Sequence, residues 1–331
     1  MHELRLNLIT REWVIISTER ARRPEDFRQR RDKKILPEID QSCPFCPGNE
    51  HKTPDEIMRM PDDGSWLIRV IPNKFAAFSS EGERIRKSDG LKQLITGVGK
   101  HEVIIESSSH NTPTALLPVE DIANIIKVYK KRFIDVYSNP VIRHVIIFKN
   151  QGEGSGTSIV HPHSQLLGTP ITPFQVRGRI SEARRFFDNT GECLLCATLK
   201  DELTDGRRII LNTEHFVTFI PYAALSPFHT WIFPKRHAAT FGNIRDDEII
   251  DLAYNLKTIL SKLYCGLENP DFNYVIRSEN LKESGSEYFH WYLSIVPRLA
   301  QVSGFELGSG MYTNASVPEE VAEFLRKVKI Q

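Results

Sequence analysis

Several features are missing from this 331-residue chain, and each absence excludes a class of protein. Net charge is nearly zero, because 43 Lys and Arg residues face 42 Asp and Glu residues. This excludes a broadly basic nucleic-acid binder and an acidic solvating protein, but not a local cationic pocket. No apolar run reaches the roughly 18 residues of a membrane span, and MHELRLNLITREW lacks the apolar core of a signal peptide. We therefore expect a cytoplasmic protein that binds neither membrane nor nucleic acid.

Cysteine is scarce, but four of the five residues form two CxxC pairs, Cys43 with Cys46 and Cys193 with Cys196. In a reducing cytosol, such pairs are typical of metal or redox centres rather than of structural disulfides. The first pair lies in a Pro/Gly-rich segment similar to a zinc knuckle, where two thiolates from one turn supply two corners of a tetrahedron. The fifth cysteine, Cys265, falls in an apolar helical pattern and is expected to be a buried packing thiol.

The order of predicted elements repeats along the chain. Each half has a strand that leads to a histidine, then an amphipathic helix, a second strand, a loop and another histidine. Asp246 is expected to cap the second helix and Gly266 to follow its end. The predicted elements are strand 101–107, helix 119–137 and strand 144–150 in the first half, and strand 229–235, helix 247–264 and strand 273–279 in the second.

The histidines of the two halves are spaced almost equally. Each half therefore has the pattern CxxC…His…His, which is a complete Cys2His2 ligand set. Two such sets in the same order indicate a duplicated fold; the alternative is that the histidines are unrelated core or surface residues. We predict two zinc ions per chain, one held by Cys43, Cys46, His110 and His161 and the other by Cys193, Cys196, His237 and His290.

The length also predicts two domains, since one domain has about 150 residues. Residues 168–192 are rich in Pro, Gly and Arg and then turn helical, so the boundary is expected there, with domains 1–175 and 176–331. Residues 18–42 and 79–99, which are strongly charged or rich in Gly and Ser, are expected to be solvated loops.

The most informative segment is the run from the glycine-rich loop 152–158 to His161-Pro-His163-Ser-Gln165. At strand periodicity, residues 161, 163 and 165 lie on one face. The loop alone is typical of flexible linkers, but beside these histidines it predicts backbone N–H groups and hydroxyls that face an anion. Histidine, glutamine and hydroxyls together suit phosphoryl or nucleotidyl transfer, in which histidine attacks phosphorus and neutral donors stabilise the developing charge.

This segment resembles the H-x-H-x-Q signature of galactose-1-phosphate uridylyltransferases, the transferase branch of the histidine-triad superfamily. The resemblance extends from about Leu4 to Leu325, and its other matching pieces keep the family's order. They are SCPFCPGNE at 42–50, PNKFAAF at 72–78, HEVIIES with His110, FKNQG at 148–152 and GFE at 304–306.

The resemblance implies an α+β fold, a tandem pair of histidine-triad-like domains with mainly antiparallel sheets flanked by helices and related by a pseudo-twofold axis. It also implies a homodimer with sites near the subunit interface. His163 is implied as the nucleophile, Gln165 as a ligand of its phosphoryl oxygens and Ser158 as a phosphate contact. Substrate-binding roles are implied for Asn73, Phe75, Asn150, Gly156, Phe305 and Glu306.

The second half departs from the signature. It reads His290-Trp-Tyr292-Leu-Ser294, so a tyrosine stands at the nucleophile position and this half is expected to keep a metal site without catalysis. The better-known bacterial members fill the second metal site with Glu and His, whereas the softer Cys2His2 set here favours zinc. That set, with the FELG run that begins at Phe305, also resembles a plant branch of ADP-glucose phosphorylases.

We therefore predict a nucleotidyltransferase of galactose metabolism that binds a nucleotide sugar and a sugar 1-phosphate. It would pass UMP between UDP-glucose and galactose 1-phosphate in a ping-pong reaction through uridylyl-histidine. One alternative is the same chemistry with ADP-glucose and inorganic phosphate, and another is a non-catalytic zinc-containing nucleotide-binding protein. The run from Asn73 to Phe75 favours the uridylyl branch, and the second metal set favours the adenylyl branch.

Overall fold

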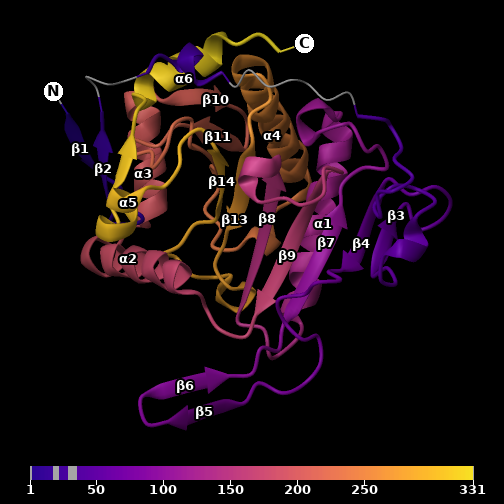
Figure 1. The fold of residues 1–331 in the computed structure, drawn as a ribbon. Coiled ribbons are helices and arrows are strands. Elements are labelled where there is room, and N and C mark those ends of the chain that lie inside the picture. Colours follow the sequence, from indigo (N-terminus) through magenta and orange to yellow (C-terminus); the bar gives the residue numbers. More distant parts are fainter. Residues whose placement is uncertain (1, 18–21, 29–35, 331) are drawn as a thin grey trace.

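A computed structural model describes residues 2–17, 22–28 and 36–330 of the chain. In this described part, one large antiparallel sheet has the strand order β10-β11-β12-β14-β13-β8-β9-β7-β4-β3 (Figure 1). Its strands are β3 (Met58–Met60), β4 (Ile68–Pro72), β7 (Lys100–Ile105), β8 (His144–Gln151), β9 (His163–Thr169), β10 (Ile209–Asn212), β11 (Phe216–Phe219), β12 (Thr230–Pro234), β13 (Phe272–Arg277) and β14 (Tyr292–Pro297).

The two halves of this sheet are related by a pseudo-twofold axis. From the centre outward, the first half runs β8-β9-β7-β4-β3 and the second runs β13-β14-β12-β11-β10, which is the same topology. β8 and β13 pair antiparallel at the centre, as a twofold axis between two strands requires. The predicted α+β fold, with two similar halves of antiparallel sheet flanked by helices and a pseudo-twofold axis between them, is confirmed. The division at residue 175 stays a prediction, since the halves share one sheet.

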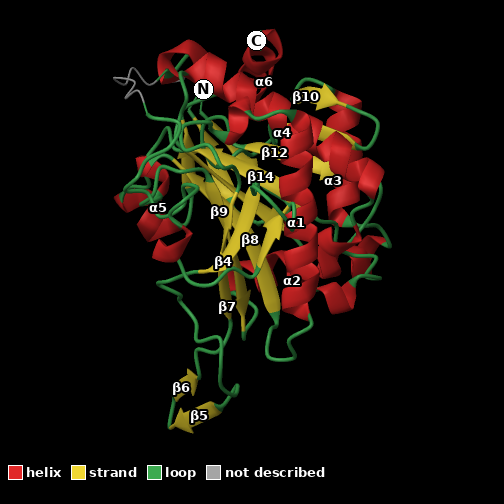
Figure 2. Cartoon of the chain, turned by 90° about the vertical axis from the view of Figure 1, so that its right-hand side faces the viewer, coloured by secondary structure: helices red, strands yellow, loops and turns green. Residues whose placement is uncertain are grey.

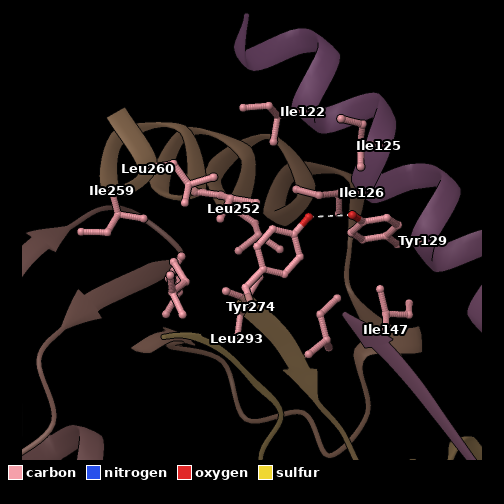
Figure 3. Packing of buried hydrophobic residues seen from close by; sticks show 14 of the residues in the cluster. Ile122, Ile125, Ile126, Tyr129, Ile147, Leu252, Ile259, Leu260, Tyr274 and Leu293 are labelled. Atoms are coloured by element: carbon pink, nitrogen blue, oxygen red, sulfur yellow. Dashed lines mark hydrogen bonds between the residues drawn. The ribbon is translucent and has the colours of Figure 1, made fainter. Parts of the chain in front are cut away.

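The helices α1 (Val119–Tyr137) and α4 (Asp246–Leu267) lie side by side against the sheet (Figures 1 and 2). Their apolar faces and strands of both halves form one continuous core, part of which is drawn in Figure 3. Each fully buried aliphatic side chain there stabilises the fold by about 1.5–3 kcal/mol. The predicted apolar positions of α1 are all buried: Ile122, Ile125, Ile126, Tyr129 and Phe133. The remaining helices are α2 (Phe174–Thr190), α3 (Leu194–Asp205), α5 (Gly304–Ser309) and α6 (Pro318–Lys327).

All the strands and helices expected from the repeat are present, with ends that differ by a few residues. The N-terminus of α4 differs from the prediction, because Arg245 is its cap residue and Asp246 is already helical. The backbone N–H of Arg245 donates to Glu248 Oε2 at 2.8 Å, so the glutamate completes the first turn.

The C-terminus of α4 also differs. Gly266 lies inside the helix and not after its end. A Cβ there would be 3.0 Å from side-chain atoms of Phe324 in α6 and of Val328 just after it. The glycine therefore allows α6 to pack closely on α4. Cys265 is exposed, so the expectation of a buried thiol was wrong.

Two smaller sheets complete the fold. The first joins strands from early in the sequence to a strand from late in it, since β2 (Trp13–Ile16) pairs with β1 (Glu3–Leu6) and with β15 (Tyr312–Asn314). The second is the hairpin of β5 (Arg86–Asp89) and β6 (Lys92–Ile95), which stands away from the body (Figures 1 and 2). Segment 79–99 is thus solvated as expected but is not merely a loop.

Segment 18–42 is described only in part, since residues 18–21 and 29–35 lie outside the described residues. Within the rest, a 3-10 turn at Pro24–Phe27 places Phe27 in the main core, so this segment is not all solvated. The segment expected to join the halves contains α2. None of the helices that the structure describes has the length and apolar character needed to cross a bilayer.

Candidate active site and metal sites

The first Cys/His group gathers four buried side chains from distant parts of the chain. One ligand atom from each of Cys43, Cys46, His110 and His161 lies within 4.8 Å of the others. Cys46 Sγ is 3.5 Å from Nδ1 of both histidines, and Cys43 Sγ is 3.8 Å from His161 Nδ1. With Zn–S near 2.3 Å and Zn–N near 2.0 Å, a tetrahedral site has S···N edges of about 3.5 Å. The donor set and its spacing therefore fit zinc.

Neighbouring groups orient these donors. His161 Nε2–H donates to the carbonyl of Ser107 at 2.7 Å, which leaves the Nδ1 lone pair for a metal. Burial lowers the pKa of His161 to about 4, so its ring is neutral. The N–H of Asp40 donates to Cys46 Sγ at 3.3 Å. Burial raises the pKa of the Cys43 thiol to about 11, and a bound cation would favour its thiolate form.

A second group lies in the other half. One ligand atom from each of Cys193, Cys196 and His237 is within 4.8 Å of the others. His290, the fourth residue expected here, is not part of this group of three but lies beside it, with its Nδ1 3.2 Å from Cys196 Sγ, the same distance as His237 Nδ1. His237 Nε2–H donates to the carbonyl of Ser286 at 3.1 Å. The hydrogen bond from Cys196 lowers the pKa of Cys193 to about 5. Both halves therefore contain a Cys/His group that could bind a metal ion.

His163 is the first residue of β9, and hydrogen bonding selects its tautomer. Its Nδ1–H donates to the carbonyl of His161 at 2.8 Å, so the lone pair lies on Nε2. Burial lowers the pKa of this ring, which keeps it neutral. The ring of Phe45 packs edge-on at a centroid distance of 5.3 Å. A neutral, oriented imidazole of this kind is a suitable nucleophile.

Sequence reasoning missed a buried polar network behind His163. Lys149 Nζ donates to the His163 carbonyl at 3.2 Å and to Glu106 at 2.6 Å. Burial opposes ionisation of Glu106, but the Lys149 ammonium holds its pKa below the usual value. Tyr129 donates to Glu106 at 2.7 Å, and its hydroxyl lies 2.6 Å from that of Tyr274 in the other half (Figure 3). The sequence signal was a charged residue directly after an apolar run, Glu106 after residues 103–105 and Lys149 after residues 145–148.

Gln165 is joined to the segment expected to bind a nucleoside. Its Oε1 lies 2.7 Å from His101 Nε2 and accepts from Asn73 Nδ2 at 3.4 Å. The Asn73 amide is oriented by the N–H of Phe75, which donates to its Oδ1 at 2.8 Å. The Phe75 side chain is 85% exposed, so its ring is accessible to a ligand. Sequence reasoning missed His101, although it is a polar residue at the start of an apolar strand.

The glycine-rich loop differs from the expected anion cradle. The N–H of Gly154 donates to Asp271 Oδ2 at 2.7 Å, and the N–H groups of residues 155 and 156 donate to carbonyls of the same loop. Gly152 has φ +81, and a Cβ there would lie 1.8 Å from Asp271 Oδ1. The glycines thus allow the second half to pack against the loop. The hydroxyl-bearing Ser158 is exposed at the end of the loop.

Asn150 is likewise held by the second half. Its Oδ1 accepts from Asn273 Nδ2 at 2.6 Å, and the same amide donates to the Ser155 carbonyl at 3.0 Å. The pairing of β8 with β13 brings these asparagines directly opposite each other. Sequence reasoning had no signal for this contact.

Phe305 and Glu306 are not brought to His163 within this chain. Figure 1 shows α5 at the left of the molecule beside β15, well away from β9 near the centre. Glu306 Oε2 accepts from the N–H of Ser303 at 3.0 Å and from its hydroxyl, so the carboxylate completes a capping box. The hydrogen bond from the Ser303 hydroxyl lowers the pKa of Glu306 to about 2.

The second half has aromatic rings at the position that corresponds to His163. Tyr292 is buried, with its ring centroid 5.3 Å from Trp231 and 4.8 Å from Phe233. Aromatic side chains therefore fill the space around this position, which agrees with the expectation that the second half has no nucleophile there.

The sequence profile of the N-terminal domain of galactose-1-phosphate uridyl transferase matches residues 1–173, and that of the C-terminal domain matches residues 179–329. The chain belongs to the galactose-1-phosphate uridylyltransferase family. Membership of this family supports the prediction that the protein is an enzyme and that it transfers a nucleotidyl group.

The proteins to which this chain is similar carry two different names. ADP-glucose phosphorylase of Arabidopsis thaliana is 38% identical over 99% of this chain and 93% of its own length. Galactose-1-phosphate uridylyltransferase of Haemophilus influenzae is 30% identical over 97% of this chain and 93% of its own. A crystal structure of an Arabidopsis thaliana ADP-glucose phosphorylase with bound ADP-glucose aligns with a TM-score of 0.84 and 34% identity, covering 100% of both chains.

Proposed function

We propose that this protein transfers a nucleotidyl group from a nucleotide sugar to a phosphate-bearing acceptor, with His163 as the nucleophile. The observation that carries the proposal is the hydrogen bond from His163 Nδ1 to the His161 carbonyl, because it leaves Nε2 unprotonated. Burial, which keeps the ring neutral, supports the same role.

The reaction consists of two displacements at one phosphorus. His163 Nε2 attacks the α-phosphorus of the nucleotide sugar, the bond to the bridging oxygen breaks, and sugar 1-phosphate leaves with the electron pair. A phosphate oxygen of the acceptor then attacks the same phosphorus and displaces the imidazole. The His161 carbonyl, which accepts Nδ1–H, stabilises the positive charge that the ring acquires. Gln165 would donate to the phosphoryl oxygens, and Ser158 would contact the leaving or incoming phosphate.

We further propose that zinc occupies both Cys/His groups, with two ions per chain. In the first group, Cys43, Cys46, His110 and His161 would hold the ion, and four protein ligands leave no open position for a substrate. Bound zinc would therefore supply structural cross-linking. His161, fixed in this way, would hold the carbonyl that orients His163.

The first candidate donor and acceptor are UDP-glucose and galactose 1-phosphate. This pair follows from the resemblance of the segment from Asn73 to Phe75 to the uridylyl branch, and the name of the Haemophilus influenzae relative supports it. Asn73 and Phe75 would contact the nucleoside, with Asn150 and Gly156 near the ribose and phosphates.

The second candidate pair is ADP-glucose and inorganic phosphate. The specific observation in its favour is the higher identity, 38%, to the Arabidopsis thaliana ADP-glucose phosphorylase. The Cys2His2 composition of the second metal group agrees with this branch. Both candidates use the same histidine chemistry.

A homodimer is part of the proposal. Within one chain, α5 lies away from β9 (Figure 1), so Phe305 and Glu306 would reach a bound sugar only if they came from another copy. A cytoplasmic location remains the expectation drawn from the sequence.

The experiment that tests the function is a panel of nucleotide sugars labelled at the α-phosphorus. UDP-glucose, UDP-galactose, ADP-glucose and GDP-mannose are each incubated with the protein, then with galactose 1-phosphate or inorganic phosphate. An acid-labile, base-stable label on the protein, chased by one acceptor, supports the proposal and identifies the substrates. Binding of a nucleotide sugar with no label from any donor would instead favour a non-catalytic zinc-containing nucleotide-binding protein.

A further inference from the structure

His101, which has no part in the two displacements proposed for His163, contacts the side-chain amide of Gln165. His101 lies two residues before Val103, which is the residue paired with Gln165 across β7 and β9. The backbone N–H of Ala77 donates to His101 Nδ1 at 3.1 Å. A neutral imidazole whose Nδ1 accepts must carry its proton on Nε2. His101 Nε2–H therefore donates to Gln165 Oε1, 2.7 Å away. Asn73 Nδ2 lies 3.0 Å from the same ring nitrogen, and since both groups are then donors, the Asn73 amide hydrogen is directed at Gln165 Oε1 and not at the ring.

This hydrogen bond decides which end of the Gln165 amide is available to a substrate. Oε1 accepts from His101 and also from Asn73 Nδ2 at 3.4 Å, so both of its acceptor sites are used. The amide nitrogen has no hydrogen bond to any other residue that the structure describes. Because Gln165 and His163 alternate along β9, they lie on the same face of the strand. The donor end of the amide is thus free on the face that carries the nucleophile.

The second half, which lacks the nucleophile, has a histidine at the position that corresponds to His101. Across β12 and β14, Ser294 pairs with Trp231, and His229 lies two residues before that tryptophan. His229 Nε2 lies 2.9 Å from Ser294 Oγ, so His229 and Ser294 occupy the positions of His101 and Gln165. Trp231 Nε1–H donates to the same nitrogen at 3.0 Å, so here the ring accepts and the serine hydroxyl donates. The shared register therefore brings these two strand positions together in both halves, although the hydrogen bond runs in the opposite direction in the second.

We propose that His101 is a positioning residue that holds the Gln165 amide with its N–H groups toward the transferred phosphoryl group. This inference rests on the proposed function of His163 and Gln165. Without the donor from His101, the amide could rotate by half a turn and present Oε1 to a phosphoryl oxygen. Its contribution should appear in the rate of phosphoryl transfer and not in the affinity for the nucleotide sugar.

Two variants of His101 separate its two hydrogen bonds. The amide of glutamine occupies roughly the position of Nε2, and that of asparagine occupies the position of Nδ1. His101→Gln therefore keeps a donor to Gln165, while His101→Asn keeps only an acceptor for Ala77. We expect His101→Asn to slow formation of the labelled protein by about tenfold with an unchanged KM, and His101→Gln to slow it by at most about threefold. The reverse order would mean that His101 serves the loop at Ala77, and would overturn the inference.

A double-variant cycle tests whether the effect passes through Gln165. In a Gln165→Ala background, His101→Asn should cause no further slowing, because the amide that it orients is absent. A full additional tenfold loss would overturn the inference. His229→Asn makes the same chemical change in the second half and should leave the rate per folded protein unchanged. If the wild type itself gains no label from any nucleotide sugar, the proposed function fails first and this inference with it.

Discussion

The carboxylate of Glu106 lies 2.6 Å from the ammonium of Lys149, and neither side chain is exposed to solvent. The ammonium also donates to the carbonyl of His163, so the ion pair stands directly behind the proposed nucleophile. The hydroxyls of Thr114 and Tyr129 also donate hydrogen bonds to the Glu106 carboxylate. A buried pair with this many partners fixes the backbone at the start of β9, where a small displacement would move the His163 ring.

The ion pair gives a prediction about stability. Lys149→Met removes the cation and leaves the Glu106 carboxylate buried without a counter-charge, which costs about 3–5 kcal/mol of unfolding free energy. Urea unfolding of the two proteins would measure this difference. In the double variant with Glu106→Gln, no charge remains unpaired, so we expect part of the loss to be restored. A single variant as stable as the wild type would contradict this account of the network.

Metal content gives a second prediction. Cys43→Ser should lose one zinc equivalent and Cys193→Ser the other, because each serine removes a thiolate from one tetrahedral set. The two variants are matched, since the same change is made at pseudo-equivalent CxxC pairs. Metal analysis of protein purified without chelators provides the measurement. Protein with no metal at all would contradict both sites, and a single equivalent would leave only the first.

The sequence predicts those parts of the site that are carried by motifs of fixed spacing. The CxxC pairs, the spaced histidines and the His-Pro-His-Ser-Gln segment needed no knowledge of how strands pair. Helix 119–137 was found in full, because its apolar positions follow the helical period over many turns.

Contacts between the halves could not be predicted in the same way. The bond between Asn150 and Asn273 depends on the register of β8 against β13, which no local pattern specifies. His101 was missed for a related reason, since alternation along a strand gives its face but not its neighbour on the next strand. The hairpin of β5 and β6 is almost fully exposed and shows no apolar alternation, although its two-residue turn begins with Gly90, a typical hairpin residue.

The nucleophile gives a third prediction. His163→Ala should abolish both the covalent label and the exchange while the zinc content stays unchanged, because its ring bonds to the His161 carbonyl and not to the metal group. His161→Ala should instead lose metal and stability together. His163→Gly opens a cavity in which added imidazole can replace the lost ring, so rescue by imidazole would locate the chemistry there. Turnover near the wild-type rate in His163→Ala would rule out the histidine mechanism.

The last prediction concerns Gln165 and the fate of the nucleotidyl intermediate. Loss of one hydrogen bond to a developing phosphoryl charge costs about 2.7–4 kcal/mol at comparable oxyanion sites, so Gln165→Ala should slow both half-reactions by roughly 10²–10³. Glutamine donates a hydrogen bond but does not titrate, so it cannot act as a base toward water.

Gln165→His would place a titratable ring beside the phosphorus, and we expect it to raise the ratio of hydrolysis to transfer. The measurement compares release of the free nucleoside monophosphate with formation of the transfer product, for wild type and variant at equal acceptor concentration. Gln165→Asn is the matched control, because it keeps a neutral amide and should slow transfer without changing this ratio. If Gln165→His partitions as the wild type does, water is excluded by the walls of the site and not by the chemistry of this side chain.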